Sequence, residues 1–332
     1  MLETDYSAQN KDAAHGEDMR HIFVVNPIAG NGNYQQEIAN NIQSLFKDKK
    51  ISYEIYYTKF KGDAYQYIKN KSQDLIPTVF YACGGDGTLH EVVNAAYNFN
   101  HINVGVIPCG SGNDFVKNFN NSENFVNVES QLNGQQIKID LIKVNDRYAS
   151  SVCNIGLDAD AAFNMHKFKK FPFLNGSSRY ILSVLYCLFK KLGKELDVTI
   201  DNSYNMHDSY LIGVMANGHS YGGGYKCAPL AMINDGIIDL CFVKKISRLQ
   251  ILSLLSVYKV GEHLTNEKIK KFITYKKCKT LKITSKEPIN LCMDGDSFIY
   301  DDVELSIVPQ ALNFWLPKGA EVQSVKLKET VS

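Results

Sequence analysis

This sequence has almost no net charge and no long apolar run. Its 332 residues include 36 Lys and Arg against 35 Asp and Glu, a formal net charge of +1, which argues against a global electrostatic attraction to nucleic acid. No run reaches the ~20 apolar residues that a membrane-spanning helix needs, and residues 1–18 lack the apolar core of a signal peptide. We therefore expect a cytoplasmic protein without a membrane anchor, with a disordered extension at 1–19.

Closely spaced cysteines are also missing. The eight cysteines are scattered, and no two form a C-x-x-C pair. A zinc site or a disulfide framework would need tighter grouping, and several cysteines lie inside apolar runs, as Cys83 does at the end of 79–83. We therefore expect reduced, buried cysteines.

The first part of the chain alternates strand-like and helix-like segments. Apolar residues at 38, 42, 45 and 46, for example, recur at the spacing of a helix that packs on a sheet. This alternation favours a parallel α/β sheet with right-handed crossovers, and we expect this domain to span 20–130. The expected strands are 21–25, 53–57, 78–82 and 104–107, and the expected helices begin near 38 and span 63–71 and 89–97.

The pattern changes after about residue 130. Short strand-like segments separated by turn residues favour a mainly antiparallel β domain with added helices, which we expect at 131–307. The final run, 303–317, is rich in strand formers and either closes this domain or returns to the first. The expected strands are 137–144, 149–155, 196–200, 210–216, 237–243 and 280–284, and the expected helices are 177–192 and 248–258.

Three glycine-containing loops follow strands of the first domain: NPIAG at 26–30, GGDGT at 84–88 and GSGND at 110–114. Carboxyl ends of parallel strands share one edge of a sheet, so the loops should converge in one crevice. Glycines there let backbone amides approach anionic oxygens, and helices expected after the second and third loops would add the field of their N-termini. The sequence contains neither the Walker motif GxxxxGK[ST] nor a dinucleotide GxGxxG in the first strand–helix turn.

One acidic side chain, Asp86, lies among the glycines of the second loop. A phosphate-bound Mg²⁺ would find a hard oxygen ligand at this position. A single Gly-Gly pair would indicate only a turn, but three such loops at three strand ends indicate a phosphate site.

These loops, in this order, resemble the catalytic domain of the diacylglycerol kinase and sphingosine kinase family. The likeness continues through NIGLD at 154–158, YGGG at 221–224, NDGIID at 234–239 and MDGD at 293–296, and so covers nearly the whole chain from about 21 to 319. It implies an α/β nucleotide domain like that of 6-phosphofructokinase and a β-sandwich, with residues at about 308–328 returning to the first domain. It also implies phosphate transfer from ATP, with Mg²⁺, to a lipid hydroxyl such as that of diacylglycerol.

The resemblance further implies roles for residues. Asp86 would act near the phosphates and Mg²⁺, and a second, structural Mg²⁺ would be bound by the carboxylate of Asp235 and the main-chain oxygens of Met232 and Ile237. The expected ATP-binding residues are Asn26, Pro27, Gly30, Thr58, Gly84, Gly85, Asp86, Gly87, Thr88, Glu91, Gly110, Ser111, Gly112, Asn113 and Asp114.

The resemblance places the catalytic base in the Asp294-Gly295-Asp296 turn. Many family members have Asp-Gly-Glu, whereas this chain has Asp296 at the third position. Aspartate is one methylene shorter, but its carboxylate can still accept a hydroxyl proton from a closer lipid or through a water. Asp296, or Asp294, is therefore the expected base, and the Asp-Gly pair also predicts a hairpin turn between two strands.

Two other functions remain open at this point. An NAD kinase-like enzyme would share the GGDGT loop, and a catalytically inactive lipid-binding protein could keep the same fold. The apolar stretch 178–191, flanked by basic residues, and the lysines at 268–277 could meet a membrane. For the first stretch the sequence slightly favours the alternative, a buried helix with a solvated, charged end. We expect a peripheral lipid substrate, no nucleic acid and a possible homodimer, and we expect His90 and His219 to be structural.

Overall fold

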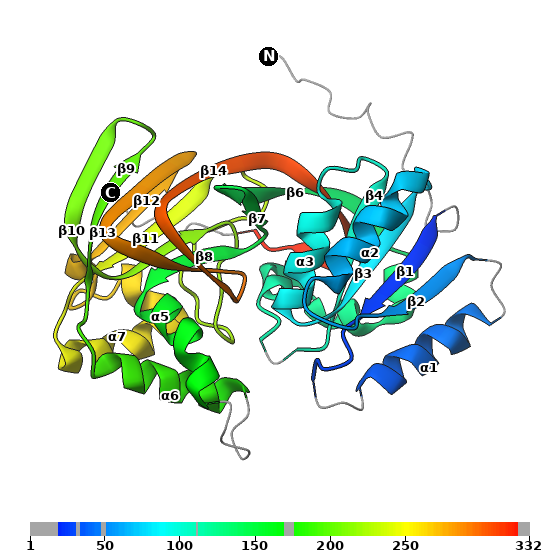
Figure 1. The fold of residues 1–332 in the computed structure, drawn as a ribbon, viewed down its shortest axis with the longest axis horizontal. Helices are drawn as coiled ribbons and strands as arrows, with labels where there is room; N and C mark the ends of the chain where they lie inside the picture. Colours follow the sequence, from blue (N-terminus) through cyan, green and yellow to red (C-terminus); the bar gives the residue numbers. More distant parts are fainter. Residues whose placement is uncertain (1–18, 31–33, 48–50, 111, 169–175, 325–332) are drawn as a thin grey trace, which may run out of the picture.

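The computed structural model describes residues 19–30, 34–47, 51–110, 112–168 and 176–324. The expected disordered extension lies outside these residues except for Met19, which is buried. Figure 1 shows an α/β half and a β-rich half that lie next to each other. No helix of the described residues is long and apolar enough to cross a membrane, and the eight cysteines are free, with all but Cys109 buried.

The α/β half contains four parallel strands in the order β4-β3-β1-β2, which confirms the parallel sheet. Buried apolar residues fill β1 and β3 on both faces because helices cover the sheet, as expected for parallel strands. The elements are β1 (Arg20–Val25), α1 (Tyr34–Phe46), β2 (Tyr53–Tyr57), α2 (Asp63–Lys71), β3 (Thr78–Gly84), α3 (Asp86–Ala96) and β4 (Ile102–Pro108).

Two expectations about helix starts were wrong. Helix α3 begins at Asp86 rather than at Leu89, because Gly85 is extended and precedes the first turn directly. The third loop is followed by a short 3-10 helix, Phe115–Asn118, instead of an α-helix. Of the second and third loops, only the second therefore leads directly into an α-helix.

The β-rich half is built mainly from antiparallel pairs, which confirms the predicted class. Its strands are β6 (Gln135–Val144), β7 (Arg147–Ala149), β8 (Val152–Gly156), β9 (Lys194–Ile200), β10 (Tyr204–Ala216), β11 (Ile238–Lys244), β12 (Ile273–Cys278) and β13 (Thr280–Met293). Its helices are α5 (Leu157–Asn164), α6 (Gly176–Leu188) and α7 (Arg248–Val260). The short elements β5 (Phe119–Asn120), α4 (Val128–Leu132) and β15 (Glu321–Val322) flank the α/β half.

The single strand expected at 149–155 is divided. Strand β7 ends at Ala149 and β8 begins at Val152, so Ser150 and Ser151 form a break between them. Helix α5 and strand β12 were not anticipated. Two of the lysines interpreted as a membrane-facing cluster, Lys276 and Lys277, lie within β12.

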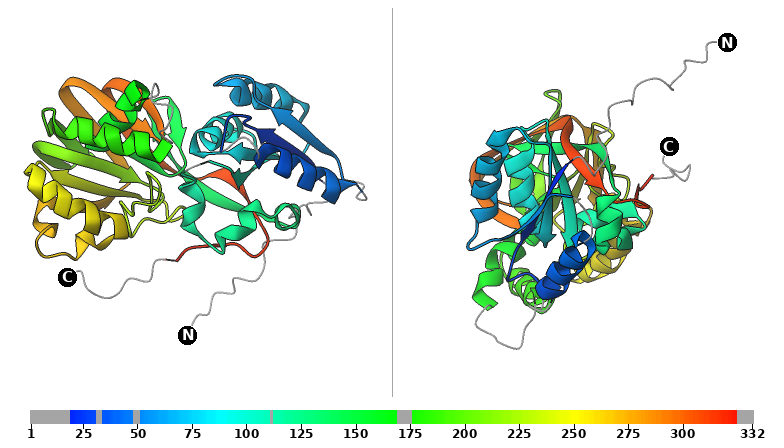
Figure 2. Two further views of the ribbon diagram at one scale, coloured as in Figure 1. Left: turned by 90° about the horizontal axis from the view of Figure 1, so that it is seen from below. Right: turned by 90° about the vertical axis from the view of Figure 1, so that its right-hand side faces the viewer.

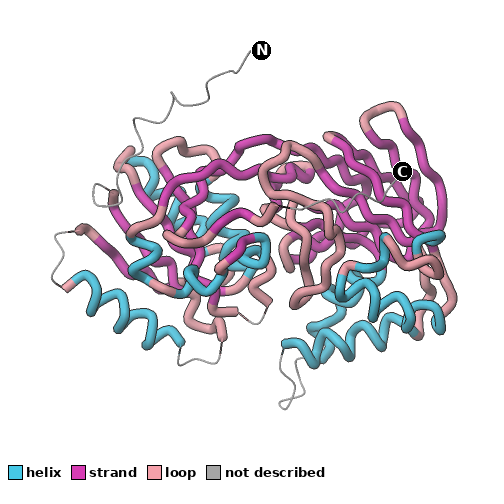
Figure 3. The backbone as a smooth tube through the Cα atoms, turned by 180° about the vertical axis from the view of Figure 1, so that it is seen from behind, coloured by secondary structure: helices cyan, strands magenta, loops and turns pink. Residues whose placement is uncertain are grey.

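Strand β14 (Asp296–Leu316) runs through both halves and joins them into one 13-stranded sheet. Its first part pairs with β13, and its last part pairs with β6 on one side and meets β4 in parallel at Phe314 on the other. A register shift between Val308 and Leu312 separates the two parts, and Gln310 there has a φ of +53°. The final run thus closes the β-rich half and also extends the α/β sheet (Figures 1 and 3).

The hydrophobic core forms separate clusters in the α/β half and in the β-rich half. Phe314 and Trp315 belong to clusters on opposite faces of the α/β sheet. In the β-rich half, one cluster includes Ile283 and a second lies where Leu254 of α7 and Cys187 of α6 cover the sheet. Figure 2 shows α6 and α7 on the same half of the molecule, apart from the helices of the α/β half.

Candidate active site

The three glycine loops converge, as expected from the parallel sheet. Cys83 of β3 is in register with Val25 of β1, and Gly84 is in register with Pro108 of β4, so the strands end at one level. Asn26 of the first loop donates from Nδ2 to Oγ1 of Thr88 over 3.1 Å. The loops therefore form one surface at the carboxyl edge of the sheet.

Two glycines are required where these loops touch. A Cβ added to Gly110 would lie 2.5 Å from the Cα of Gly85, and a Cβ added to Gly84 would lie 2.3 Å from Oγ1 of Thr88. Neither clash could be removed by a small side-chain movement. The first would be with the backbone of Gly85, and the second would be with the side chain of Thr88, which is held in the first turn of α3. The glycines thus permit the close backbone packing that exposes loop amides.

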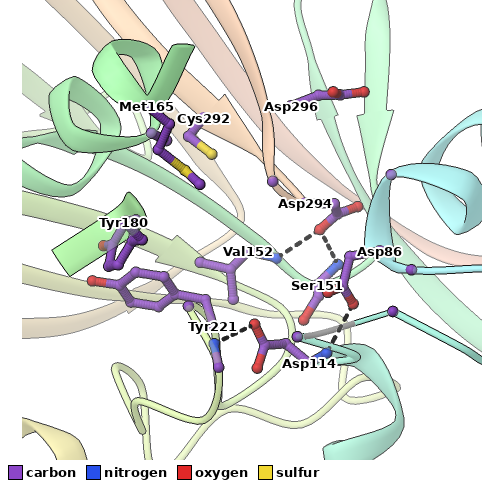
Figure 4. A pocket seen from close by; sticks show the side chains of 18 of the residues that line it. Asp86, Asp114, Ser151, Val152, Met165, Tyr180, Tyr221, Cys292, Asp294 and Asp296 are labelled. Atoms are coloured by element: carbon purple, nitrogen blue, oxygen red, sulfur yellow. Dashed lines mark hydrogen bonds between the residues drawn. The ribbon is translucent and has the colours of Figure 1, made fainter. Parts of the chain in front are cut away.

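Asp86 projects from the first turn of α3 toward the third loop (Figure 4). Its Oδ1 accepts from the backbone N of Asp114 over 2.8 Å, while its Oδ2 lies 2.9 Å from where a Cβ on Gly112 would be. Burial, and next the negative charge of Asp114, raise the pKa of Asp86 to about 6. This carboxylate lacks a compensating positive charge and is suited to receive a cation.

The carboxylate of Asp114 is already paired. Lys117 donates from Nζ to its Oδ1 over 2.5 Å, and the backbone N of Gly223 donates to its Oδ2 over 3.0 Å. The second contact ties the YGGG segment of the β-rich half to the third glycine loop. Asp114 therefore organises the loop, and Asp86 is the more available of the two carboxylates.

The remaining predicted ATP-binding residues lie around the same edge. Asn113 has a φ of +49° and its Oδ1 accepts from the backbone N of Gly110 over 3.0 Å. Glu91 accepts the backbone N–H of Gly62 over 2.8 Å, and Thr58 donates its backbone N–H to Val25. Ser111 lies outside the described residues. The loop-edge residues Asn26, Pro27, Gly30, Thr58, Gly85, Gly87, Thr88, Glu91, Gly110 and Gly112 all line one cavity.

Asp294 is held firmly in the β13–β14 turn. The backbone N–H groups of Ser150, Ser151 and Val152 donate to its carboxylate over 2.7–3.0 Å (Figure 4), and its side chain is only 4% exposed. Although burial alone would raise the pKa of Asp294, the nearby His90 and these amides hold it below its usual value. Nδ1 of His90 lies 3.6 Å from Oδ2 of Asp294.

Asp296 stands at the start of β14, two residues beyond this anchor. Asp294 and Gly295 both have positive φ values, +46° and +91°, which confirms the predicted hairpin turn. The side chain of Asp296 is 20% exposed, and its Oδ1 accepts from Nζ of Lys61 over 2.6 Å. Asp294 and Asp296 both line the cavity, but the carboxylate of Asp294 accepts from backbone amides whereas that of Asp296 accepts from Lys61.

The cavity has a volume of about 1790 Å³ and two different ends. One end is polar and is lined by the glycine loops with Asp86, Asp294 and Asp296. The other end is an apolar arm between α5, α6 and α7. The residues that line this arm include Leu157, Met165, Tyr180, Ile181, Val184, Leu185, Leu188, Leu252, Leu254, Leu255 and Tyr258.

A buried carboxylate that the sequence did not single out, Asp158, lies in the apolar arm. The hydroxyls of Tyr180 and Tyr221 donate to it. Burial raises the pKa of Asp158 to about 7, and the Tyr180 hydrogen bond offsets only part of this effect. Lys61 and the amides at 150–152 were also missed. Asp158 and Tyr221 fall in motifs that carried the family resemblance, which was the only available signal.

The predicted structural metal site lies away from this cavity, in the loop before β11. Oδ2 of Asp235 is 3.5 Å from Nζ of Lys277, and the same ammonium is 3.3 Å from Asp239. No group of three His, Cys, Asp or Glu residues within the described ranges could hold a metal ion. Asp235 and Asp239 both lie beside this ammonium, and the metal-binding roles of Met232, Asp235 and Ile237 remain a prediction from which we derive no step.

Comparison with known proteins agrees with this architecture. Residues 20–144 match the model of the diacylglycerol kinase catalytic domain, and residues 151–316 match the YegS C-terminal NAD kinase beta sandwich-like domain. A diacylglycerol kinase of Bacillus subtilis is 27% identical over 285 residues, covering 83% of this chain and 89% of that protein. One from Staphylococcus carnosus is also 27% identical and covers 83% and 88%.

A crystal structure of a diacylglycerol kinase from Bacillus anthracis has the same fold. It superposes with a TM-score of 0.64 at 18% identity, over 91% of this chain and 97% of that one. The fold and matched domains define a lipid kinase architecture. The chain belongs to the diacylglycerol kinase catalytic domain family, and a kinase family implies the use of ATP.

Proposed function

We propose that the protein transfers the γ-phosphate of ATP to a lipid hydroxyl, with diacylglycerol or a related lipid alcohol as acceptor. The observation that carries this proposal is the single cavity that joins the glycine loops to an apolar arm, with Asp296 at its polar end. A soluble acceptor would not need an apolar arm of this extent. The arm is long enough to be lined by three helices, which suits an acyl or isoprenoid chain.

Asp296 is proposed as the proton acceptor, because its carboxylate reaches the cavity while that of Asp294 is committed to backbone amides. Asp294 would instead fix the turn that aims Asp296. The proposal keeps the aspartate as a working replacement for the family's usual glutamate. Most of the rate would come from alignment of the hydroxyl with the phosphate and from charge stabilisation.

Asp86 fits a Mg²⁺ ion that accompanies ATP. Its raised pKa reports a carboxylate with too little positive charge nearby, and carboxylate oxygen is the ligand that Mg²⁺ prefers. When bound, Mg²⁺ would neutralise phosphate charge. Asp86 would hold this ion, the glycine loop would lie against the phosphates, and Asp296 would take the proton.

We further propose that the lipid is reached from a membrane surface through α6 and α7. Ile181, Leu185 and Leu252 line the apolar arm and are also 45–59% exposed outside it. Phe189 and Leu249, 85% and 80% exposed, extend this apolar surface. The exposed basic residues Lys190, Lys191, Arg248 and Lys259 surround it, a combination suited to an anionic bilayer.

The test is phosphate transfer from radiolabelled ATP with Mg²⁺ to lipid alcohols in mixed micelles. The panel contains diacylglycerol, phosphatidylglycerol, a sphingoid base and an undecaprenyl-like alcohol, with NAD as the soluble control. We expect label in a lipid and a loss of about 10²–10⁴-fold in Asp296→Asn, the contribution typical of a general base. Asp302→Asn, an exposed acid on the same strand, should retain activity. Label in NAD alone would identify a nucleotide kinase, and no label in any acceptor would identify an inactive lipid-binding protein.

A further inference from the structure

Lys61 connects the two halves of the molecule at the polar end of the cavity. It lies in the loop between β2 and α2, and its Nζ donates to Oδ1 of Asp296 over 2.6 Å. The two residues are 235 positions apart in sequence, and both line the cavity. An ammonium group from the α/β half therefore lies against the carboxylate proposed as the proton acceptor.

The backbone of this loop is fixed, although the side chain is not. The backbone N of Gly62 donates to Oε1 of Glu91 over 2.8 Å, and that of Lys59 donates to Oδ2 of Asp63 over 2.8 Å. The side chain of Lys61 is 75% exposed, compared with 20% for Asp296. Its ammonium can therefore change position while the backbone that carries it stays fixed.

The polar end needs a cation that the glycine loops do not supply. The acidic residues Asp86, Glu91, Asp114, Asp294 and Asp296 line this end, and the nearby Lys117 is committed to Asp114 and to the carbonyl of Gly112. Among the described residues that line the cavity, the other cationic side chains are Lys59, Arg179 and Lys259, and the last two belong to α6 and α7. Phosphates brought into an acidic cavity require positive charge, and the loop at 58–62 is the part of the α/β half placed to offer it.

We propose that Lys61 is a positioning residue for phosphoryl transfer, shared between Asp296 and the phosphoryl group in transfer. Before the reaction it orients the carboxylate of Asp296. During the reaction its ammonium stabilises the charge on the transferred group. This inference rests on the proposed function.

The step is balanced without any further reactant. The lipid hydroxyl oxygen forms a bond to the γ-phosphorus as the bond from that phosphorus to the bridging oxygen breaks, and ADP leaves with the electron pair. The hydroxyl proton passes to Asp296. Lys61 contributes charge and orientation only.

The experiment compares Lys61→Ala, Lys61→Arg and Lys71→Ala in the lipid kinase assay. Lys71, on α2, pairs with Glu54 and is not among the residues that line the cavity, so it is a matched control. We expect Lys61→Ala to lower kcat by about 10- to 100-fold, somewhat less than for a fully buried donor. KM for the lipid should change by less than about threefold, because the contact acts in the transition state. Lys61→Arg should recover most of the rate, and Lys71→Ala should match the wild type.

A variant that combines Lys61→Ala with Asp296→Asn tests whether Lys61 acts through Asp296. If Lys61 acts through Asp296, the loss in Lys61→Ala with Asp296→Asn will be smaller than the product of the two single losses. Melting temperatures equal to the wild type, expected for an exposed side chain, exclude unfolding as the cause. An active wild type with an unchanged Lys61→Ala, or with an Arg variant as impaired as the Ala variant, would overturn this role alone. A wild type that labels no lipid would instead reject the proposed function and this role together.

Discussion

Two aspartates only two positions apart have opposite environments in this protein. Asp294 is buried against three backbone amides of the β7–β8 break, whereas Asp296 is more exposed and pairs with Lys61. The first arrangement fixes a turn, and the second leaves an oxygen near a reacting group. The chemical role of each carboxylate therefore follows from its partners, since the side chains are identical.

Asp158 should make stability depend on pH. Its pKa is raised to about 7, so between the value of an unfolded aspartate, about 3.9, and pH 7 the folded state binds an extra proton. The corresponding stability is present below pH 4 and is lost as the pH rises through 7. We predict that the melting temperature of Asp158→Asn minus that of the wild type is larger at pH 8 than at pH 5. Each kcal/mol of stability that the wild type loses between these pH values should add about 2–4 °C to this difference.

Differential scanning calorimetry at the two pH values measures this difference. Asp302→Asn, which changes an exposed aspartate, should show the same offset from the wild type at both. An offset for Asp158→Asn that is independent of pH would contradict a raised pKa in the folded state.

Helix α6 shows how one element can face both the core and the outside. Ser183 and Cys187 are buried, while Ile181, Leu185 and Phe189 are exposed at a spacing of four residues. The sequence is apolar on both faces, so the alternative of a fully buried helix was reasonable but is wrong. Packing on the β-rich sheet selects the inner face and leaves an apolar outer face beside the mouth of the cavity.

This outer face predicts membrane binding. The double variant Phe189→Ser and Leu249→Ser should weaken binding to vesicles of phosphatidylglycerol and phosphatidylcholine by about tenfold or more, because each side chain loses apolar area that contacts lipid. Vesicle sedimentation measures the affinity. Leu75→Ser, which changes a leucine 72% exposed on the α/β half, is the control. Equal weakening by both variants, or by neither, would exclude α6 and α7 as the docking surface.

Strand β14 makes the two halves mechanically dependent on each other. It carries Trp315, the only tryptophan, which is 1% exposed in the core of the α/β half and donates to the carbonyl of Gln131. The same strand pairs with β13 in the β-rich half. Loss of either half would leave part of β14 without its neighbours.

Unfolding should therefore be cooperative between the halves. Ile283→Ala opens a cavity in the β-rich core at a cost of about 2–5 kcal/mol, and we expect it to shift the urea midpoint of Trp315 fluorescence in the other half. Far-UV circular dichroism should give the same midpoint. Ile299→Ala, at a site 55% exposed on β14, should have little effect. A fluorescence midpoint unaffected by Ile283→Ala would show that the halves unfold independently.

Local sequence was enough for features that depend on period and turn chemistry. Alternating segments predicted the parallel strands, the three glycine loops predicted their convergence, and Asp294-Gly295 predicted the hairpin. Errors arose where neighbours decide the outcome. The extended Gly85 starts α3 three residues early, and the turn at Ser150 and Ser151 divides an expected strand because its amides bind Asp294.

The sequence by itself determined the fold class, the family and the residues of the phosphate-type loops, because these depend on short patterns that contiguous residues carry. Only the tertiary structure decided that backbone amides occupy Asp294, that Lys61 meets Asp296, and that α6 keeps an apolar face outside. Each of these is a contact or an exposure set by segments far apart in the chain. Their distances depend on how β14 brings the two halves together, and no local pattern encodes that placement.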